Sequence, residues 1–218
     1  MSFVEVPLPS VEQQNQMIEK ATTDLKAVML ELFAEEEHKP FRLMVKTLLP
    51  QLKDSPASST VRYHGAWAGG LLVHTVGVMQ VALTMAETFG PEFLKIEQRT
   101  DFRRSIAKTT FLHDIGKIGD GEKPYYLPQD NEWRKEKLGE RYMINRDLDE
   151  LTYLPVPIRG TWLAQKFGVY LSPEEVQAII SSDGPQTEMG KVVSTFLETP
   201  LTILVHFADK WVSQVRRV

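Results

Sequence analysis

Residues 106–118 hold the side chains whose types and spacing are best suited to chemistry. The segment reads IAKTTFLHDIGKI, so an apolar stretch with helical spacing delivers His113 and Asp114 just before Gly116. Adjacent side chains on a regular helix point about 100° apart, but this restriction relaxes where a helix ends at a glycine. An imidazole and a carboxylate aimed at one point are good ligands for a divalent cation. The dipeptide alone leaves open a second interpretation, a buried histidine beside a capping aspartate.

The composition is that of an ordinary globular domain, and it excludes several kinds of site. The 218 residues are 42% hydrophobic and 25% charged, with a net charge of −4. This acidic balance argues against a large, non-specific nucleic-acid surface. The absence of cysteine excludes disulfides, thiolate catalysis and cysteine zinc sites. Without a targeting signal or an apolar run of about 18 residues, we expect a cytoplasmic protein with no membrane partner, in the host cytoplasm if it is phage-encoded.

Apolar residues recur with a period near 3.6 through almost the whole chain, which predicts an all-α fold. Pro50 is expected to kink or end the second helix. Residues 1–60 are expected to form a helical elaboration packed on a domain of residues 61–218. The predicted helices begin at Ser10, at Pro40 and near Pro200, and cover about 66–88, 101–115, 158–167 and 172–180.

Residues 119–157 differ in character from the rest of the chain. They contain four prolines, four tyrosines and Trp133. A long segment of this kind beside a candidate site is typical of a lid or a binding wall. We therefore predict a lid-like, loop-rich insertion, with a possible short hairpin around a one-turn helix; an ordinary surface loop is the alternative.

Two further polar residues lie on apolar helix faces. His74 shares its face with Leu71 and Val78, and Asp209 shares its face with Val205. An unpaired carboxylate in such a place costs several kcal/mol, so Asp209 needs a cation or several donors. A single inward histidine is usually a hydrogen-bonded core residue. Taken together with His113 and Asp114, however, these side chains provide two imidazoles and two carboxylates for one divalent ion.

This order of residues, a His, then His-Asp, then a distant Asp, resembles the HD-domain metal-dependent phosphohydrolase superfamily. The resemblance covers about 60–217 and is carried by residues 69–75 (GGLLVHT), 111–117 (FLHDIGK) and 204–209 (LVHFAD). It is closest to the HD domain of certain 3′–5′ exoribonucleases and to stand-alone phage-type HD proteins. It implies an HD-domain-like helical bundle.

The same resemblance implies a metal ion held by His74, His113, Asp114 and Asp209. Its identity is open among Mn²⁺, Mg²⁺, Fe²⁺, Co²⁺, Ni²⁺ and Zn²⁺. Binuclear HD enzymes place further histidines between the His-Asp pair and the final Asp, whereas this chain has none over 114–205. The resemblance therefore implies one ion rather than two.

Other residues are candidates for roles around the ion, and each has a structural alternative. Lys117 could stabilise charge on a phosphoryl group, or be a solvated lysine after a helix end. Asp120 is a candidate general acid or base, and His64 could contact phosphate or move protons, although either could be structural. His206 and Asp183 are expected to support the ligands. The candidate substrate contacts are Arg62, Lys123, Trp133 and Arg159.

Three classes of function fit these residues. The first is hydrolysis of nucleotides, and the second is a 3′–5′ exonuclease or phosphodiesterase acting on short RNA or single-stranded DNA. The third is a non-catalytic module that binds a metal or nucleotide. A continuous groove lined by Arg62, Arg103, Arg104 and Lys123 would favour the oligonucleotide, and a closed pocket would favour the nucleotide. The sequence does not fix the oligomeric state.

Overall fold

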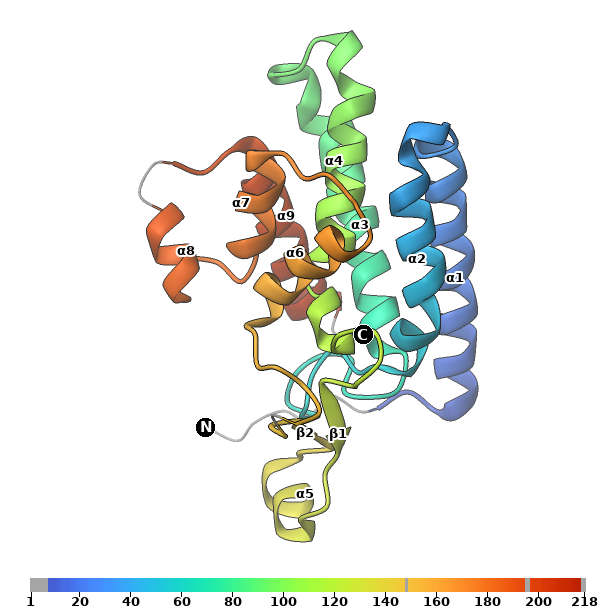
Figure 1. Cartoon of the computed structure of the whole chain (residues 1–218), viewed down its shortest axis with the longest axis vertical. Coiled ribbons are helices and arrows are strands. Elements are labelled where there is room, and N and C mark those ends of the chain that lie inside the picture. The colour runs from blue at the N-terminus through green and yellow to red at the C-terminus, as the bar shows by residue number, and fades with distance from the viewer. Residues whose placement is uncertain (1–7, 148, 195–196, 217–218) are drawn as a thin grey trace.

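The computed structural model of the chain describes residues 8–147, 149–194 and 197–216, and its fold is all-α apart from one small sheet, as predicted (Figure 1). The first seven residues of the expected N-terminal elaboration lie outside the described part. The helices are α1 (Val11–Leu32), α2 (Lys39–Asp54), α3 (Gly70–Phe89), α4 (Arg99–Leu112), α5 (Glu132–Leu138), α6 (Val156–Lys166), α7 (Pro173–Ile180), α8 (Glu188–Val193) and α9 (Pro200–Trp211).

Helix α3 is the centre of the fold. It packs against α1, α2, α4 and α9, and in Figure 1 the pair α1–α2 lies on one side of it while α7 and α9 lie on the other. Its side chains Leu71, Leu72 and Met79 are fully buried in the main core. Among the described helices, the stretch Gly70–Glu92 is long and apolar enough to cross a membrane, but 67% of its window is buried, as in the core helix of a soluble protein.

Local signals explain most helix ends. Ser10 and Gln13 form the capping box that starts α1. Helix α3 begins four residues later than predicted, because Gly69 has φ 92° and cannot continue a right-handed helix. Of the two expectations for Pro50, a kink or a helix end, the helix end was wrong, since α2 continues to Asp54. Pro50 and Lys46 are both exposed, so the carbonyl group that loses its partner can bind water.

The predicted hairpin is present in the insertion. Strands β1 (Tyr126–Pro128) and β2 (Tyr142–Ile144) pair antiparallel, and α5 connects them at the end farthest from the helical body (Figure 1). Asn131 caps the start of α5 by accepting the backbone N–H of Arg134. The hairpin is also tied to the loop before α3, since Thr60 forms a β-bridge with Glu140.

Helix α6 packs directly behind the segment that follows α4. A side chain on Gly160 would lie 2.4 Å from the carbonyl oxygen of Leu112, and one on Gly116 would lie 2.2 Å from the carbonyl oxygen of Val156. The two backbones are therefore in contact, and only glycine fits at these positions. This contact fixes the place of His113 and Asp114, which lie between Leu112 and Gly116 in the chain.

This packing makes Gly160→Ala a test of the fold. Alanine favours a helix interior over glycine by about 1 kcal/mol, so propensity alone predicts a more stable protein. We expect the opposite, a loss of about 1–3 kcal/mol in the free energy of unfolding, because the new methyl group overlaps the Leu112 carbonyl oxygen. Urea unfolding measures the change.

Gly168→Ala is the matched control at the end of the same helix. Gly168 has φ 70° but no atom within 4 Å of an added Cβ, so the substitution tests backbone strain without a clash, at about 1–2 kcal/mol. A Gly160→Ala protein as stable as the parent would contradict the described contact between α6 and the end of α4.

Candidate metal centre

The chain turns sharply where α4 ends, and this turn brings His113 and Asp114 to the same side. We call residues 113–118 the His-Asp turn. The backbone N–H of His113 still donates to Thr109 at 2.9 Å, whereas Asp114 adopts φ −115° and ψ −1°. From there a 3-10 turn, η4 (Ile115–Ile118), continues the chain, with Lys117 N–H donating to the Asp114 carbonyl at 2.9 Å. The predicted helix over 101–115 thus ends at Leu112, and the shorter helix allows both side chains to converge.

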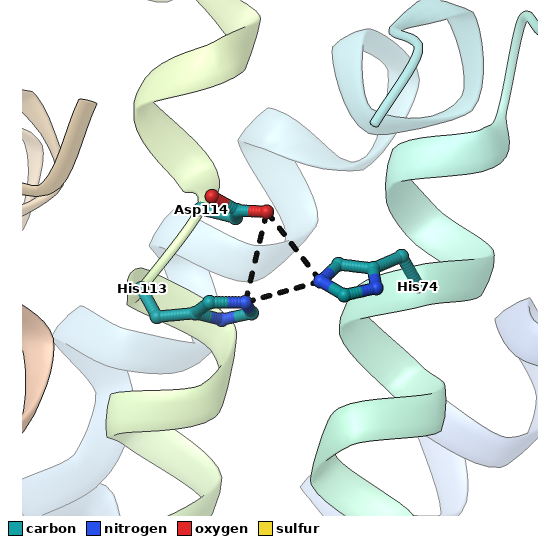
Figure 2. A group of neighbouring side chains, drawn as sticks. All are labelled: His74, His113 and Asp114. Carbon is teal, nitrogen blue, oxygen red and sulfur yellow. Dashed lines mark hydrogen bonds and ion pairs between the residues drawn. The ribbon is translucent and has the colours of Figure 1, made fainter. Parts of the chain in front are cut away.

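His74, His113 and Asp114 form a buried group that could hold a metal ion (Figure 2). Their ligand atoms all lie within 4.8 Å of one another. His74 Nε2 is 3.3 Å from His113 Nε2 and 3.4 Å from Asp114 Oδ2. Figure 2 shows the three side chains pointing toward one another from α3 and from the end of α4. The group is the buried, convergent set of nitrogen and oxygen donors that divalent transition metals prefer.

Asp209 on α9 adds a second carboxylate to this group. Its Oδ1 lies 3.0 Å from His74 Nε2 and 3.7 Å from His113 Nε2. The Asp209 carboxylate therefore has partners, as a carboxylate on an apolar helix face must have to avoid the cost of burial. The four side chains that the sequence pointed to lie together, although they come from three helical segments far apart in the chain.

Hydrogen bonds around the imidazoles suit metal binding. His113 Nδ1 lies 2.7 Å from the carbonyl oxygen of Thr110, so this nitrogen carries a proton and Nε2 is the nitrogen that faces the group and could bind an ion. His74 Nδ1 is buried without a hydrogen-bond partner among the described residues. The two Nε2 atoms face each other at 3.3 Å between two carboxylates, and a cation is the partner that all four groups can share.

In the metal-free protein, the charged side chains of the group shift one another's pKa values. Burial opposes protonation of His113, yet Asp114 and Asp209 raise its pKa to about 9. Burial also acts against ionisation of Asp209, but the two imidazoles hold the pKa of that carboxyl well below its ordinary value. The site is therefore set to bind positive charge, which the proton on His113 supplies in the metal-free protein.

Lys117 lies in the same group. Its Nζ is 2.6 Å from Asp114 Oδ2. Burial opposes the charged ammonium, but the Asp114 carboxylate raises the pKa of Lys117, so the lysine stays charged. The charge of Lys117 also acts on Tyr126 of β1, where burial nevertheless raises the pKa of the phenol to about 12. Sequence reasoning counted Tyr126 among the insertion's tyrosines but did not single it out.

His64 is also close to the group. Its ring lies over that of His74, with 4.3 Å between centroids. Burial, and then the charges of His74 and Lys117, lower the pKa of His64 to about 3, so this imidazole is neutral at physiological pH. Its Nε2 is buried and has no hydrogen-bond partner among the described residues. His64 therefore lies beside His74, and the role suggested for it from the sequence stays a prediction.

The turn after α7 borders the site through two of the predicted supporting residues. His206 Nδ1 lies 2.8 Å from the carbonyl oxygen of Ser182, so His206 holds this turn and not the ion. Asp183 follows Ser182 and is exposed, yet desolvation and the Asp114 carboxylate raise its pKa. The charge of Asp114 therefore acts on Asp183, as expected for a residue near the group.

Asp120 and the predicted substrate contacts have their described interactions elsewhere. Asp120 Oδ1 accepts the backbone N–H groups of Glu122 and Lys123, so it closes a turn. Lys123 is 3.9 Å from Glu150, Arg62 donates to the Lys137 carbonyl group, and Trp133 is exposed on α5. The structure does not join these side chains to the metal-binding group through any described contact.

Arg159 has a structural position that the sequence did not predict. It is 1% exposed and donates to the carbonyl groups of Gly116 and Thr152, at 3.1 and 3.0 Å. Its guanidinium also lies 5.0 Å from the centre of the Tyr125 ring. Arg159 therefore supports the His-Asp turn from behind, and these contacts leave little of it to meet a substrate.

Binding of a divalent ion should stabilise the folded protein. At a free Mn²⁺ concentration a hundredfold above Kd, we expect a gain of about 2.7 kcal/mol, or about 5–10 °C in Tm, over the metal-stripped protein. Differential scanning fluorimetry with and without Mn²⁺ measures it. The gain should vanish in His113→Ala and Asp209→Asn and persist in His38→Ala, whose histidine lies outside the site. Equal gains in all four proteins would contradict a metal centre at this position.

Arg159→Lys tests the structural position of Arg159. Lysine keeps the charge but cannot reach two carbonyl groups at once, so one buried acceptor is left unpaired at a cost of about 1–3 kcal/mol. Chemical denaturation measures the loss, and the Mn²⁺ affinity should stay within about twofold of the parent. Arg99→Lys, at an exposed position, is the control and should change stability by less than about 0.5 kcal/mol. Unchanged stability with lost substrate binding would restore the original prediction.

Comparison with known proteins adds no assignment to this geometry. No family model matches the chain, and neither a curated protein nor a solved structure matches it. The likeness to HD-domain phosphohydrolases stays an expectation from the sequence. What the structure adds is the convergence of His74, His113 and Asp114 in a group that could hold a metal ion.

Proposed function

We propose that this chain is a soluble, cytoplasmic, metal-dependent phosphohydrolase of the HD type that acts on nucleotides. One observation carries the proposal: two imidazoles and two carboxylates converge in a buried group, with the ammonium of Lys117 2.6 Å from Asp114. The Lys117 ammonium also provides a donor that a phosphate oxygen could use. The order of these residues in the chain, which resembles that of HD enzymes, agrees with this assignment.

Different residues of the site are suited to different parts of the hydrolysis. A divalent ion held by His74, His113, Asp114 and Asp209 would supply the charge that polarises a phosphate and acidifies water. Lys117 donates to the phosphate oxygens, on which negative charge increases in the transition state. In the reaction, a water oxygen bonds to phosphorus, the bond from phosphorus to the leaving oxygen breaks, and one proton passes from the water to that oxygen. Neutral His64 and Asp183, with its raised pKa, are the candidate groups for moving this proton.

The distribution of basic residues supports a nucleotide over an oligonucleotide. Arg103 pairs with Glu31 and Glu87, and Arg104 pairs with Glu35 and Asp101. These arginines face the N-terminal helices, and their charge is balanced by carboxylates. A binding groove for a polymer needs a continuous run of unpaired cations along the backbone path. The predicted groove therefore has little support, and an exonuclease becomes the less favoured reading.

A substrate panel tests the proposal. Metal-stripped protein would be assayed with and without Mn²⁺ against nucleoside mono- and triphosphates, cyclic nucleotides, and short RNA and DNA. We expect Mn²⁺-dependent hydrolysis of a nucleotide, absent in His113→Ala. Lys117→Met should lower kcat by about a hundredfold, because it removes a donor to the transition state. Lys26→Met, an exposed lysine on α1, should match the parent.

The other outcomes separate the alternatives. Turnover of RNA or DNA oligomers alone would replace the proposal with an exonuclease. Stoichiometric Mn²⁺ binding with no turnover across the panel would leave a binding module.

A further inference from the structure

Helix α9 is apolar on both of its faces. One face is buried against α3, α4 and α7. The other face carries a row of four apolar side chains that are 43–59% exposed, which we call the α9 stripe: Ile203, Phe207, Trp211 and Val215. A helix that is apolar all round is normally buried on all sides, so the exposed stripe is expected to contact a partner.

The stripe is continuous, because its members are four residues apart. Side chains at this spacing lie one above the other on a helix surface. The rings of Phe207 and Trp211 stack on each other, with 6.0 Å between centroids and 22° between planes. The π turn η5 (Val212–Arg216) continues the helix beyond α9 and keeps Val215 exposed. The four side chains therefore form one apolar surface, unlike single hydrophobic residues scattered over a protein.

Few charges interrupt this surface. Among the exposed residues of 200–215, a range that the structure describes without gaps, Lys210 alone is charged. Helix α1 is the contrast, since Glu12, Lys20 and Lys26 lie on its exposed face, as is usual for a helix that faces water. A lipid surface fits poorly, because a helix at a membrane surface normally presents several lysines or arginines to anionic lipids. The stripe is therefore suited to the apolar surface of another protein chain.

The stripe is large enough to be the centre of a dimer interface. With about half of each side chain exposed, it offers on the order of 400 Å² of apolar surface. The core of a homodimer interface is about 65% apolar, so this centre corresponds to about 600 Å² on each copy, or about 1,200 Å² in total. A specific interface needs about 1,000 Å² or more, and two stripes packed together would exceed it.

The stripe presents the same order of side chains in both directions. A branched aliphatic residue stands at each end and two aromatic residues stand between them, centred on the level of Asp209. Two stripes laid antiparallel across a twofold axis at this level pair Phe207 of one copy with Trp211 of the other. The same arrangement places Ile203 against Val215. A second copy of this chain therefore matches the stripe along its whole length.

We propose that this chain forms a symmetric dimer, in which the α9 stripes of two copies pack antiparallel. Asp209 lies at the level of the twofold axis, but its carboxylate points the other way, toward His74 at 3.0 Å. Each copy therefore keeps its metal-binding group within its own chain. The contact involves neither a metal ion nor a substrate, so the inference is independent of the proposed function.

Sedimentation equilibrium of the full, metal-free chain measures the association. We expect a monomer–dimer equilibrium with a Kd in the micromolar range or below. Trp211→Glu puts a carboxylate from each copy into the centre of the interface, so it should raise Kd at least about a hundredfold. Leu30→Glu is the matched control, because Leu30 is an exposed apolar residue on α1, and it should associate as the parent does. Circular dichroism establishes that both variants are folded.

Engineered cysteines test the orientation, and the chain has no cysteine of its own. A mixture of Ile203→Cys and Val215→Cys chains should form an intermolecular disulfide under mild oxidation, whereas either variant alone should not. In the antiparallel dimer the two copies of position 203 are about 18 Å apart along the helices, which is too far for a disulfide.

A chain that stays monomeric at about 100 μM would overturn the dimer. If that monomer sediments with vesicles of phosphatidylcholine and phosphatidylglycerol, the stripe is a lipid-binding surface instead. A dimer that persists in folded Trp211→Glu, or a disulfide in Ile203→Cys alone, would overturn the proposed arrangement. Should Trp211→Glu not fold, the cysteine mixture decides, since the absence of a disulfide between positions 203 and 215 excludes the antiparallel contact.

Discussion

The fold depends on holding two carboxylates, two imidazoles and an ammonium together inside a core that is otherwise largely apolar. Taking such groups out of water is costly, and removing one member of a buried ion pair typically costs about 3–5 kcal/mol. The carboxylates in this group have positive neighbours within 4 Å, as between Asp209 and His113 or Asp114 and Lys117. The contributing helices α3, α4 and α9 all contact one another, so the electrostatic balance and the packing of the core require the same arrangement.

The arrangement of the backbone behind the site serves the same requirement. Gly116 and Gly160 allow α6 to touch the end of α4, and the guanidinium of Arg159 bonds to the Gly116 carbonyl group. The buried Arg159 cation, which donates to carbonyl groups of Gly116 and Thr152, thus stabilises a 3-10 turn that is tighter than an α-helix. The ligand side chains thus sit on a rigid base, and preorganisation of this kind lets a site act on charge without rearranging its own dipoles.

Much of the fold, and the four grouped side chains, could be predicted from the sequence because their signals are local. Helical periodicity gave the helices, and a carboxylate on the apolar face of α9 required partners. The role of Arg159 could not be predicted, since its partners lie 43 and 7 residues away and are backbone carbonyl groups, which leave no mark on residue type. That α2 does not end at Pro50 could not be predicted either, because whether a proline ends a helix depends on whether water reaches the freed carbonyl group. The effect of the Lys117 charge on Tyr126 depends on how the hairpin docks, which the strand pattern alone does not determine.

The proposed function would give the β1–β2 hairpin of the insertion a role in distinguishing substrates. The metal-binding group would attract any phosphate by its charge, so charge alone would not distinguish one phosphate compound from another. Discrimination between substrates needs a wall that contacts the rest of the molecule. On the proposed function, the β1–β2 hairpin is the candidate for this wall, because the charges of Lys117 and Asp114 act on the phenol of Tyr126. β1 begins nine residues after Lys117, so a short chain segment joins the hairpin to the charged group. On the proposed function, we therefore expect selectivity to depend on the hairpin, and reactivity to depend on the group that α3, the His-Asp turn and α9 bring together.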